Sequence, residues 1–299
     1  MPRIAFALAL AAIALWSTLA ALSLRLQPLQ PFLLAGIGLS VGGLLSAPRW
    51  REWELPMRER LVGLGGILGY HVLYFQALRQ REAVVEANLI NYLWPLLIVL
   101  LAPLILTKHA LGARHWLAAG AGFAGTALIV AGEGFDPRPG HVVSWLCAFA
   151  AAVVWALYSL LSKRLAIPTT AIGGLCVVSG LASIGISRVV EGPIVPRLAT
   201  LNGIDWGCLA AIALGPLGAA FFAWDAALKR GDARIIGVLA YLTPLLSTLL
   251  LIAVGRPFHL ATAVAMVLIV GGALLGSWGG WRSPGTGRIT RRTSRSLKP

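Results

Sequence analysis

The 299-residue chain is 58% hydrophobic and only 12% charged, with a formal net charge of +14 at pH 7. A soluble globular domain carries about 25% charged residues, so this composition excludes a chain that folds in water. A basic chain can also indicate nucleic-acid binding, but here the Lys and Arg residues lie almost entirely between or beyond apolar runs. The expected partner is therefore a lipid bilayer and not a nucleic acid.

Apolar stretches long enough to cross a bilayer follow one another along almost the whole chain. About 20 apolar residues cross a hydrocarbon core of about 30 Å. The first stretch follows Arg3, as in a signal peptide, but it is long for a signal core, and we expect it to remain in the protein. Ten such stretches leave almost no polar face, which excludes buried helices of a soluble protein. The predicted spans are 4–24, 30–47, 61–78, 84–106, 114–132, 142–161, 169–187, 205–226, 234–254 and 260–279.

The basic residues are unevenly distributed over the two sides of these spans. Of the 25 Lys and Arg residues, 7 lie on the side opposite to the N-terminus, which leaves 18 on the N-terminal side. Positive charge collects on the cytoplasmic side of membrane proteins, so both termini are expected in the cytoplasm. Two termini on one side require an even number of spans, in agreement with ten.

The two halves of the sequence resemble each other. Trp16 corresponds to Trp155 at an offset of 139 residues, and the segment 128–132 resembles the segment 140 residues later. The sequence Tyr-Leu-x-Pro-Leu-Leu of residues 92–97 recurs 149 residues later. Three matches in the same order, each in the corresponding span, indicate an internal duplication.

Five spans in each half mean that the second half enters the membrane from the opposite side. The predicted fold is therefore an all-α membrane protein of ten transmembrane helices, arranged as two inverted five-helix repeats with cytoplasmic N- and C-termini. We expect the first repeat over 1–139 and the second over 140–281. Residues 282–299 have a basic, non-periodic sequence that predicts a disordered tail attracted to anionic lipid head groups.

The fourth and ninth spans each contain a proline near mid-membrane. Asn88, Asn91, Tyr92 and Pro95 recur at helical spacing and share one face of the fourth span. Pro95 and Pro244 each leave a carbonyl four residues earlier without its helical partner. Helix breaks at equivalent depths point to a transporter binding site. The alternative is that both prolines are kinks whose free carbonyls are satisfied by neighbouring Ser or Thr.

The third and sixth spans carry polar and aromatic side chains near mid-membrane. Aromatic residues also gather at membrane interfaces, but several here fall near span centres, which favours a cavity that binds an amphipathic solute. His71 could equally form a structural hydrogen bond between helices. The candidate substrate-binding residues are Trp16, Tyr70, His71, Tyr74, Asn88, Asn91, Tyr92, Trp94, Trp155, Tyr158 and Tyr241.

The acidic residues indicate no site at a span centre. Asp225 precedes Lys229 by four residues near a helix end, so an ion pair within one helix is expected. Glu82 and Glu86 lie toward the outer end of the fourth span. A gating or proton-carrying role for Glu86 is the alternative to a structural one.

Sequence motifs of nucleotide-phosphate binding and of zinc proteases are missing from the sequence. It contains no GxxxxGK[ST] or HExxH segment, and its three cysteines have no metal-ligand spacing. We therefore predict that the chain is not an enzyme and uses no cofactor and no metal. Inert thiols within apolar stretches are expected at Cys147, Cys176 and Cys208.

Taken together, these features resemble the drug/metabolite transporter superfamily, EamA type. The resemblance rests on the five-plus-five duplication, the Trp in the first helix of each half and the Tyr-Leu-x-Pro-Leu-Leu segment, and it extends to about residue 281. The segments 91–96, 70–71 and 74–75 look most like the branch of aromatic amino acid exporters.

The resemblance implies an exporter of aromatic and other neutral amino acids in the bacterial inner membrane, working by alternating access from a central cavity. The residues that match the family's cavity positions are His71, Tyr74, Asn91, Tyr92, Trp94, Trp155 and Tyr241. Thr243 departs from the pattern, because it stands where the first repeat has Trp94. The alternatives are an exporter of another metabolite or drug with the same fold, and a non-transporting scaffold or channel-like pore.

Overall fold

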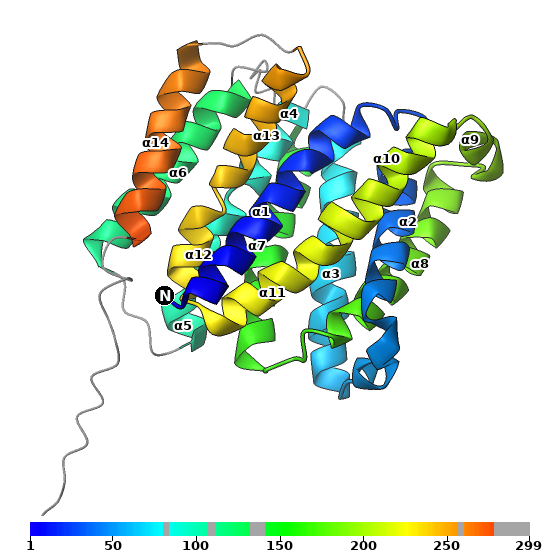
Figure 1. The fold of residues 1–299 in the computed structure, drawn as a ribbon, viewed down its shortest axis with the longest axis horizontal. Helices are drawn as coiled ribbons and strands as arrows, with labels where there is room; N and C mark the ends of the chain where they lie inside the picture. The colour runs from blue at the N-terminus through cyan, green and yellow to red at the C-terminus, as the bar shows by residue number, and fades with distance from the viewer. Residues whose placement is uncertain (80–83, 107–111, 132–140, 256–259, 278–299) are drawn as a thin grey trace, which may run out of the picture.

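The computed structural model describes residues 1–79, 84–106, 112–131, 141–255 and 260–277, and Figure 1 shows their arrangement as a bundle of helices. Within these residues every regular element is helical. The predicted tail at 282–299 and the candidate Glu82 lie outside the described residues.

Eight helices or broken helices in the described part of the chain are long and apolar enough to cross a membrane. They coincide with eight of the predicted spans, and this multi-pass helical architecture confirms the expected class of fold. They are α1 (Arg3–Ser23), α2 (Pro31–Gly43) with the 3-10 helix η1 (Leu44–Trp53), α3 (Met57–Leu78), α4 (Val84–Asn91) with α5 (Trp94–Leu106), α7 (Val142–Arg164), α8 (Ala171–Val190), α10 (Gly203–Leu214) with η4 (Gly215–Ala219) and α11 (Ala220–Arg230), and α12 (Ala233–Leu239) with α13 (Leu242–Ala253).

Two further apolar helices lie in the ranges predicted as the fifth and tenth spans. They pack against each other at one edge of the bundle, as Figure 1 shows. The short helix α9 (Val195–Ala199) connects α8 to α10. The two edge helices are α6 (Ala113–Ala131) and α14 (Leu260–Ser277).

Helices from the two halves of the chain alternate in space. Helix α1 packs on α11 and α13 of the second half, and α7 packs in the same way on α3 and α5 of the first half. Helices α2 and α8 form a close pair at the edge opposite to α6 and α14 (Figure 1). Each half is thus completed by helices of the other, and the core is shared.

Small residues allow the α2–α8 pair to approach closely. A Cβ at Gly43 would lie 2.5 Å from the carbonyl oxygen of Gly173, and a Cβ at Gly36 would lie 2.6 Å from Ile184. Membrane helices associate through such backbone proximity, because lipid supplies no hydrophobic driving force between them.

The two ends of the bundle are named here after the N-terminus. The N-side is the end at which α1 begins, and it includes the end of α11, since a Cβ at Gly231 would lie 3.1 Å from the Cβ of Ala5. The far side is the end at which α1 ends, where Arg25 Nε lies 3.3 Å from Asp205 Oδ1 at the start of α10.

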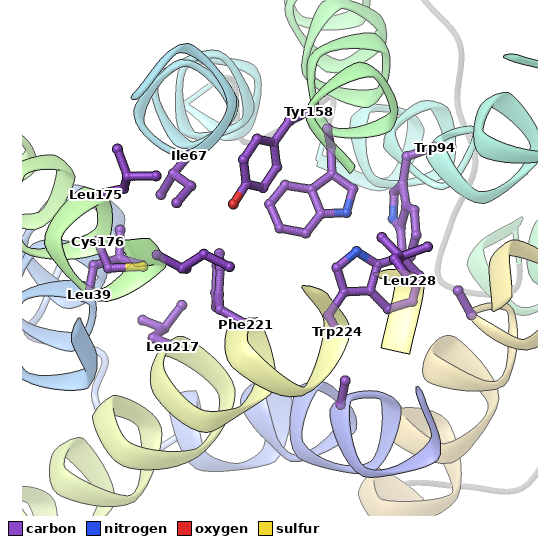
Figure 2. Close-up of a cluster of buried hydrophobic side chains, with 14 of the residues drawn as sticks. Leu39, Ile67, Trp94, Tyr158, Leu175, Cys176, Leu217, Phe221, Trp224 and Leu228 are labelled. Atoms are coloured by element: carbon purple, nitrogen blue, oxygen red, sulfur yellow. The ribbon is translucent and has the colours of Figure 1, made fainter. Parts of the chain in front are cut away.

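The apolar core lies between α7, α11 and the α2–α3–α8 side of the bundle. Figure 2 shows the side chains that fill it. They include Leu39, Ile67, Leu175, Cys176 and Leu217, and they reach the aromatic residues Phe221, Trp224 and Trp94. The apolar core therefore packs directly against these aromatic rings.

Candidate functional site

A cavity of about 660 Å³ lies between α1, α2, α3, the α4–α5 break, α7 and α11. Its volume is in the range of small-molecule binding sites. The connection between α1 and α2 supplies Leu26, Gln27, Leu29 and Gln30 to its lining, so the cavity reaches the far side. No Asp, Glu, Lys or Arg occurs among the lining residues that the structure describes.

Aromatic rings form the floor of this cavity toward the N-side. The ring centroid of Trp16 lies 6.0 Å from that of Trp155, 6.3 Å from Trp94 and 6.3 Å from Phe221. Trp224 lies beneath, 5.2 Å from Trp16, and is only 2% exposed. Edge-to-face contacts of this kind are the preferred aromatic arrangement. The layer separates the cavity from the N-side.

The orientation of Trp16 in this layer is fixed by a hydrogen bond. Its Nε1 donates to the carbonyl oxygen of Pro216 at 3.1 Å. Pro216 lies in η4, the π-helical turn between α10 and α11. Such turns are frequent at functional sites, because they free backbone carbonyls for other partners.

Helix α3 supplies a polar wall that is tied to α4. The hydroxyl of Tyr74 donates to Asn88 Oδ1 at 2.7 Å, and Asn91 Nδ2 donates to the hydroxyl of Tyr70 at 3.3 Å. The rings of Tyr70 and Tyr74 stack with centroids 5.7 Å apart. These four side chains line the cavity together.

His71 lies on the same wall and is 4% exposed. Its Nδ1 lies 2.7 Å from the carbonyl oxygen of Ile67 on its own helix. Because a carbonyl only accepts, Nδ1 donates there, and Nε2 of the neutral ring is an acceptor. This hydrogen bond of His71 therefore stays within α3 and does not join two helices.

The helix breaks at the two prolines contribute different numbers of residues to the cavity lining. Tyr92 and Leu93 separate α4 from α5, and this break lines the cavity through Asn91, Tyr92 and Trp94. The second break, at residues 240–241, separates α12 from α13 and contributes only Thr243 to the lining.

Two predicted site residues do not line this cavity. Tyr241 is 0% exposed and packs where a Cβ at Gly122 of α6 would lie 2.4 Å from its ring. Tyr158 is 5% exposed, and a Cβ at Gly66 of α3 would lie 2.2 Å from its ring. Both tyrosines fill spaces that glycines of neighbouring helices leave. Pro95 and Pro244 are buried at the breaks and are likewise absent from the lining.

The structure adds lining residues that the sequence did not indicate. Phe75, Leu217 and Phe221 are apolar, and in a membrane sequence such residues give no signal that separates a cavity from lipid. Gln27 and Gln30 lie in the short α1–α2 connection, and their polar character in an otherwise apolar region was the available signal.

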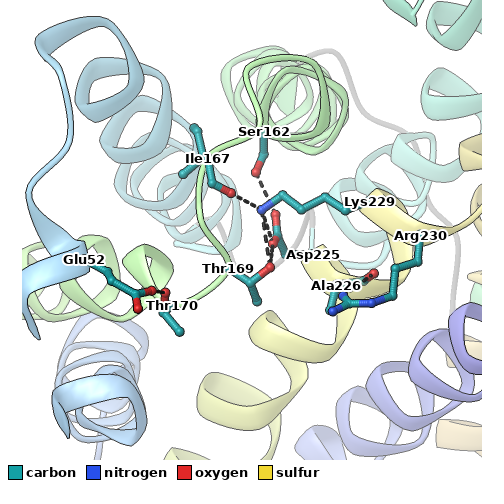
Figure 3. Close-up of polar contacts among 9 residues, drawn as sticks. All are labelled: Glu52, Ser162, Ile167, Thr169, Thr170, Asp225, Ala226, Lys229 and Arg230. Atoms are coloured by element: carbon teal, nitrogen blue, oxygen red, sulfur yellow. Dashed lines mark hydrogen bonds and ion pairs between the residues drawn. The ribbon is translucent and has the colours of Figure 1, made fainter. Parts of the chain in front are cut away.

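A polar network lies between α7 and α11 on the N-side of the aromatic floor, and Figure 3 shows its contacts. The expected ion pair between Lys229 and Asp225 is confirmed. Ser162 Oγ of α7 and Thr169 Oγ1 of the α7–α8 connection each donate to the Asp225 carboxylate at 2.6 Å. Lys229 also donates to the carbonyl oxygen of Ile167.

Glu86, the other acidic candidate, lies in the first turn of α4 and is 2% exposed.

Glu191 at the end of α8 accepts from the backbone N–H of Phe32 at 2.8 Å and of Leu33 at 3.1 Å. It thereby binds the start of α2, on the far side. A carboxylate at a helix N-terminus satisfies free N–H groups and favours the helix dipole.

A multi-pass helical protein with broken helices around a central cavity, reached from one side and closed at the other, belongs to the class of membrane transporters. The family model of the EamA-like transporter family matches residues 3–131 and 143–278, so the chain belongs to this family. It is a membrane transporter and not an enzyme.

Among curated proteins, the chain is 38% identical over 281 residues to the aromatic amino acid exporter YddG of Ancylobacter novellus, covering 88% of this chain and 93% of that one. It is 25% identical to the protein of the same name from Escherichia coli, over 89% of this chain and 94% of the relative. A solved structure described only as the crystal structure of a protein matches with a TM-score of 0.85 and 36% identity, over 93% of this chain and 97% of the other.

Proposed function

We propose that this chain exports aromatic and other neutral amino acids across the bacterial inner membrane by alternating access. The observation that carries the proposal is the aromatic cavity of about 660 Å³, whose described lining holds no formally charged side chain. A ligand with no net charge fits such a lining, because an unpaired charge is costly in an apolar site. The name of the relatives, aromatic amino acid exporter, supports the same substrate class.

The site offers separate surfaces for the two parts of an amino acid. Trp16, Trp155 and Tyr70 present ring faces and edges on which an aromatic or apolar side chain can pack. The α-ammonium and α-carboxylate groups need hydrogen-bond partners, which the amides of Asn88 and Asn91 can supply.

The proposed topology has ten spans in two inverted repeats, 1–139 and 140–281, with cytoplasmic termini and a basic tail at 282–299. The two separate matches of the family model support two repeats. The reciprocal packing of α1 on α11 and α13, and of α7 on α3 and α5, supports a two-fold relation between them. In this topology the N-side is cytoplasmic, and the cavity opens to the periplasm.

Alternating access follows from this symmetry. Two halves of similar structure can exchange conformations, so that the closed N-side opens while the open far side closes. The aromatic floor counts against a channel-like pore, since it separates the cavity from the N-side in the structure.

Transport is tested by uptake of radiolabelled phenylalanine and threonine into liposomes that contain the purified protein, with and without a pH gradient. We expect uptake above that of empty liposomes, and dependence on the gradient would identify protons as the driving ion. Absence of uptake of both solutes, with correct insertion verified, would contradict the amino acid substrate class.

A further inference from the structure

Helices α7 and α11 meet below the aromatic floor in successive contacts that run toward the N-side. Trp155 packs on Phe221 with ring centroids 5.5 Å apart. Below them, Trp224 Nε1 donates to Ser159 Oγ at 3.2 Å. Each contact joins one residue of α7 to one of α11, so separating these helices is a direct way to open the cavity to the N-side.

Nearer the N-side lies an ionic contact, and beyond it Lys163 Nζ of α7 donates to the carbonyl oxygen of Gly231 at the end of α11, at 2.5 Å. Asp225 is 4% exposed, and its carboxylate accepts from Ser162, Thr169 and Lys229. Lys229 in turn donates to the carbonyl oxygen of Ile167 in the α7–α8 connection. Figure 3 shows that these groups converge on Asp225 from α7, from the following connection and from α11. Hydrogen bonds to a charged group are about twice as strong as neutral ones.

Ser162 and Thr169, the two hydroxyl residues that donate to Asp225, have equivalents in the first repeat, on the far side. At the offset of 139 residues that relates Trp16 to Trp155, Ser23 corresponds to Ser162 and Gln30 to Thr169. Both Ser23 and Gln30 line the cavity toward its far-side mouth. On the closed N-side, Ser162 and Thr169 therefore bind a carboxylate. On the open far side, their equivalents face the cavity.

In the second repeat, Ser162 and Thr169 contact α11. The helix of the first repeat that is equivalent to α11 is α3. Residues 77–79 near the end of α3 read Ala-Leu-Arg, and residues 227–229 of α11 read Ala-Leu-Lys, 150 positions later. At this offset His71 is the equivalent of Phe221. Their rings stack with centroids 6.1 Å apart, as expected of equivalent residues close to a two-fold axis.

At the equivalent positions of α3, the far side has the cation of the network but a phenylalanine in place of the carboxylate. Arg79 takes the place of Lys229, and Phe75 takes the place of Asp225. Phe75 lines the cavity and packs on Phe32, with ring centroids 5.3 Å apart. Arg79 donates to Gln76 of its own helix at 3.3 Å. Closure of the far side by the equivalent movement would bring a phenyl ring to Ser23, where the N-side has a buried carboxylate.

We propose that Asp225 is a conformational lock that holds the N-side closed, and that the phenylalanine at the equivalent position leaves the far side without such a lock. This inference rests on the proposed two-fold repeat and alternating access. The asymmetry favours the far-side-open state in the absence of substrate. An exporter with this preference returns its empty site to the N-side only by breaking the Asp225 network.

The fraction of molecules open to the N-side can be measured without any substrate. Ser159 is 1% exposed and lies on the closed path. A Ser159→Cys reporter is placed in a background in which Cys147, Cys176 and Cys208 are changed to Ala. Its rate of modification by a membrane-impermeant thiol reagent, in everted membrane vesicles, is proportional to the population that is open to the cytoplasm.

Asp225→Asn in this background is expected to increase the modification rate by about tenfold, since it removes the charge from three hydrogen bonds. Glu54→Gln is the matched control. Glu54 follows η1 on the N-side and is exposed, so this substitution neutralises a carboxylate there without changing a contact between α7 and α11. The control rate should stay within about twofold of the parent.

A second variant leaves the N-side network intact and supplies the missing carboxylate instead. Phe75→Asp places an acid four residues before Arg79 and opposite Ser23, as Asp225 stands before Lys229 and opposite Ser162. It should stabilise far-side closure and also increase the Ser159→Cys modification rate, by about tenfold. Folding of each variant is verified by a monodisperse elution profile and an unchanged melting temperature in detergent within a few degrees.

An unchanged rate in the folded Asp225→Asn variant would overturn the lock. If that variant does not fold, an unchanged rate in Phe75→Asp overturns the proposed asymmetry. These outcomes are distinct from a failure of the proposed substrate class, since the reporter is read without amino acids. Increased modification together with absent amino acid uptake would retain the lock and reject the substrates.

Discussion

The two broken helices share the segment Tyr-Leu-x-Pro-Leu-Leu but contribute differently to the cavity. The break between α4 and α5 lines it with Asn91, Tyr92 and Trp94, whereas the break between α12 and α13 contributes only Thr243. Tyr241, the counterpart of Tyr92, is fully buried against α6 and α14. The shared motif therefore gives both helices a break, but its side chains face the cavity at the first break and the protein interior at the second.

Packing around the second break explains the difference. Helix α12 lies against the first break, since a Cβ at Gly237 would lie 3.1 Å from the carbonyl oxygen of Pro95. The ring of Tyr241 fills the space over Gly122, which has no side chain to exclude it. The second break thus packs against the first, and only Thr243, two residues after the second break, reaches the cavity.

The largest effect on transport is expected from Trp94→Ala in the first break. Trp94 lies 5.4 Å from Trp224 and 6.3 Å from Trp16 between ring centroids, so its removal opens the aromatic floor and deletes a stacking surface. We expect the initial rate of phenylalanine uptake to fall by about tenfold or more. Threonine uptake should fall less, because threonine has no ring to stack.

Uptake in liposomes with matched protein content measures this effect, and the melting temperature in detergent controls for folding. An undiminished phenylalanine rate in the folded variant would show that the first break is not part of the substrate site.

An effect on stability rather than transport is expected from Gly122→Val beside the second break. A Cβ at this position would lie 2.4 Å from Tyr241 Cδ2 and 2.8 Å from its Cγ. The buried ring has no free space to enter, and overpacking of this kind costs about 1–3 kcal/mol. The melting temperature in detergent should fall by several degrees, with a normal uptake rate per folded molecule at low temperature.

Gly120→Val is the control, because a Cβ at Gly120 has no neighbour within 4 Å. Equal melting temperatures of the two variants would mean that Tyr241 is not held against α6.

The sequence allowed the spans and both helix breaks to be located, because apolar length and the missing N–H of proline are local properties. The direction in which the Tyr241 side chain points is not determined by the neighbouring sequence. It depends on Gly122, which lies four predicted spans earlier, and no pattern within the ninth span records that glycine. The same limit applies to Phe75 and Phe221, since an apolar residue in a membrane helix has the same sequence signature whether it faces lipid or a cavity.

The Asp225 network shows this limit for polar residues. The spacing to Lys229 predicted the ion pair within α11. Ser162 and Thr169 come from another helix and its following connection, so only the packing of α7 on α11 revealed that the pair is buried and joins two helices. Local spacing identified the charges, and tertiary structure gave them a role.

The smallest effect is expected from Thr243→Val, at the one position of the second break that reaches the cavity. Valine has nearly the shape of threonine, and within the described residues Thr243 Oγ1 has no hydrogen-bond partner. The bond that Ser17 Oγ donates, at 3.2 Å, goes to the backbone carbonyl of Thr243 and survives the substitution. The uptake rates of phenylalanine and threonine should both stay within about twofold of the parent, because no protein contact is lost. A selective loss of threonine uptake would instead show that the Thr243 hydroxyl binds a polar substrate side chain. The second break would then act on specificity as well as supporting the first.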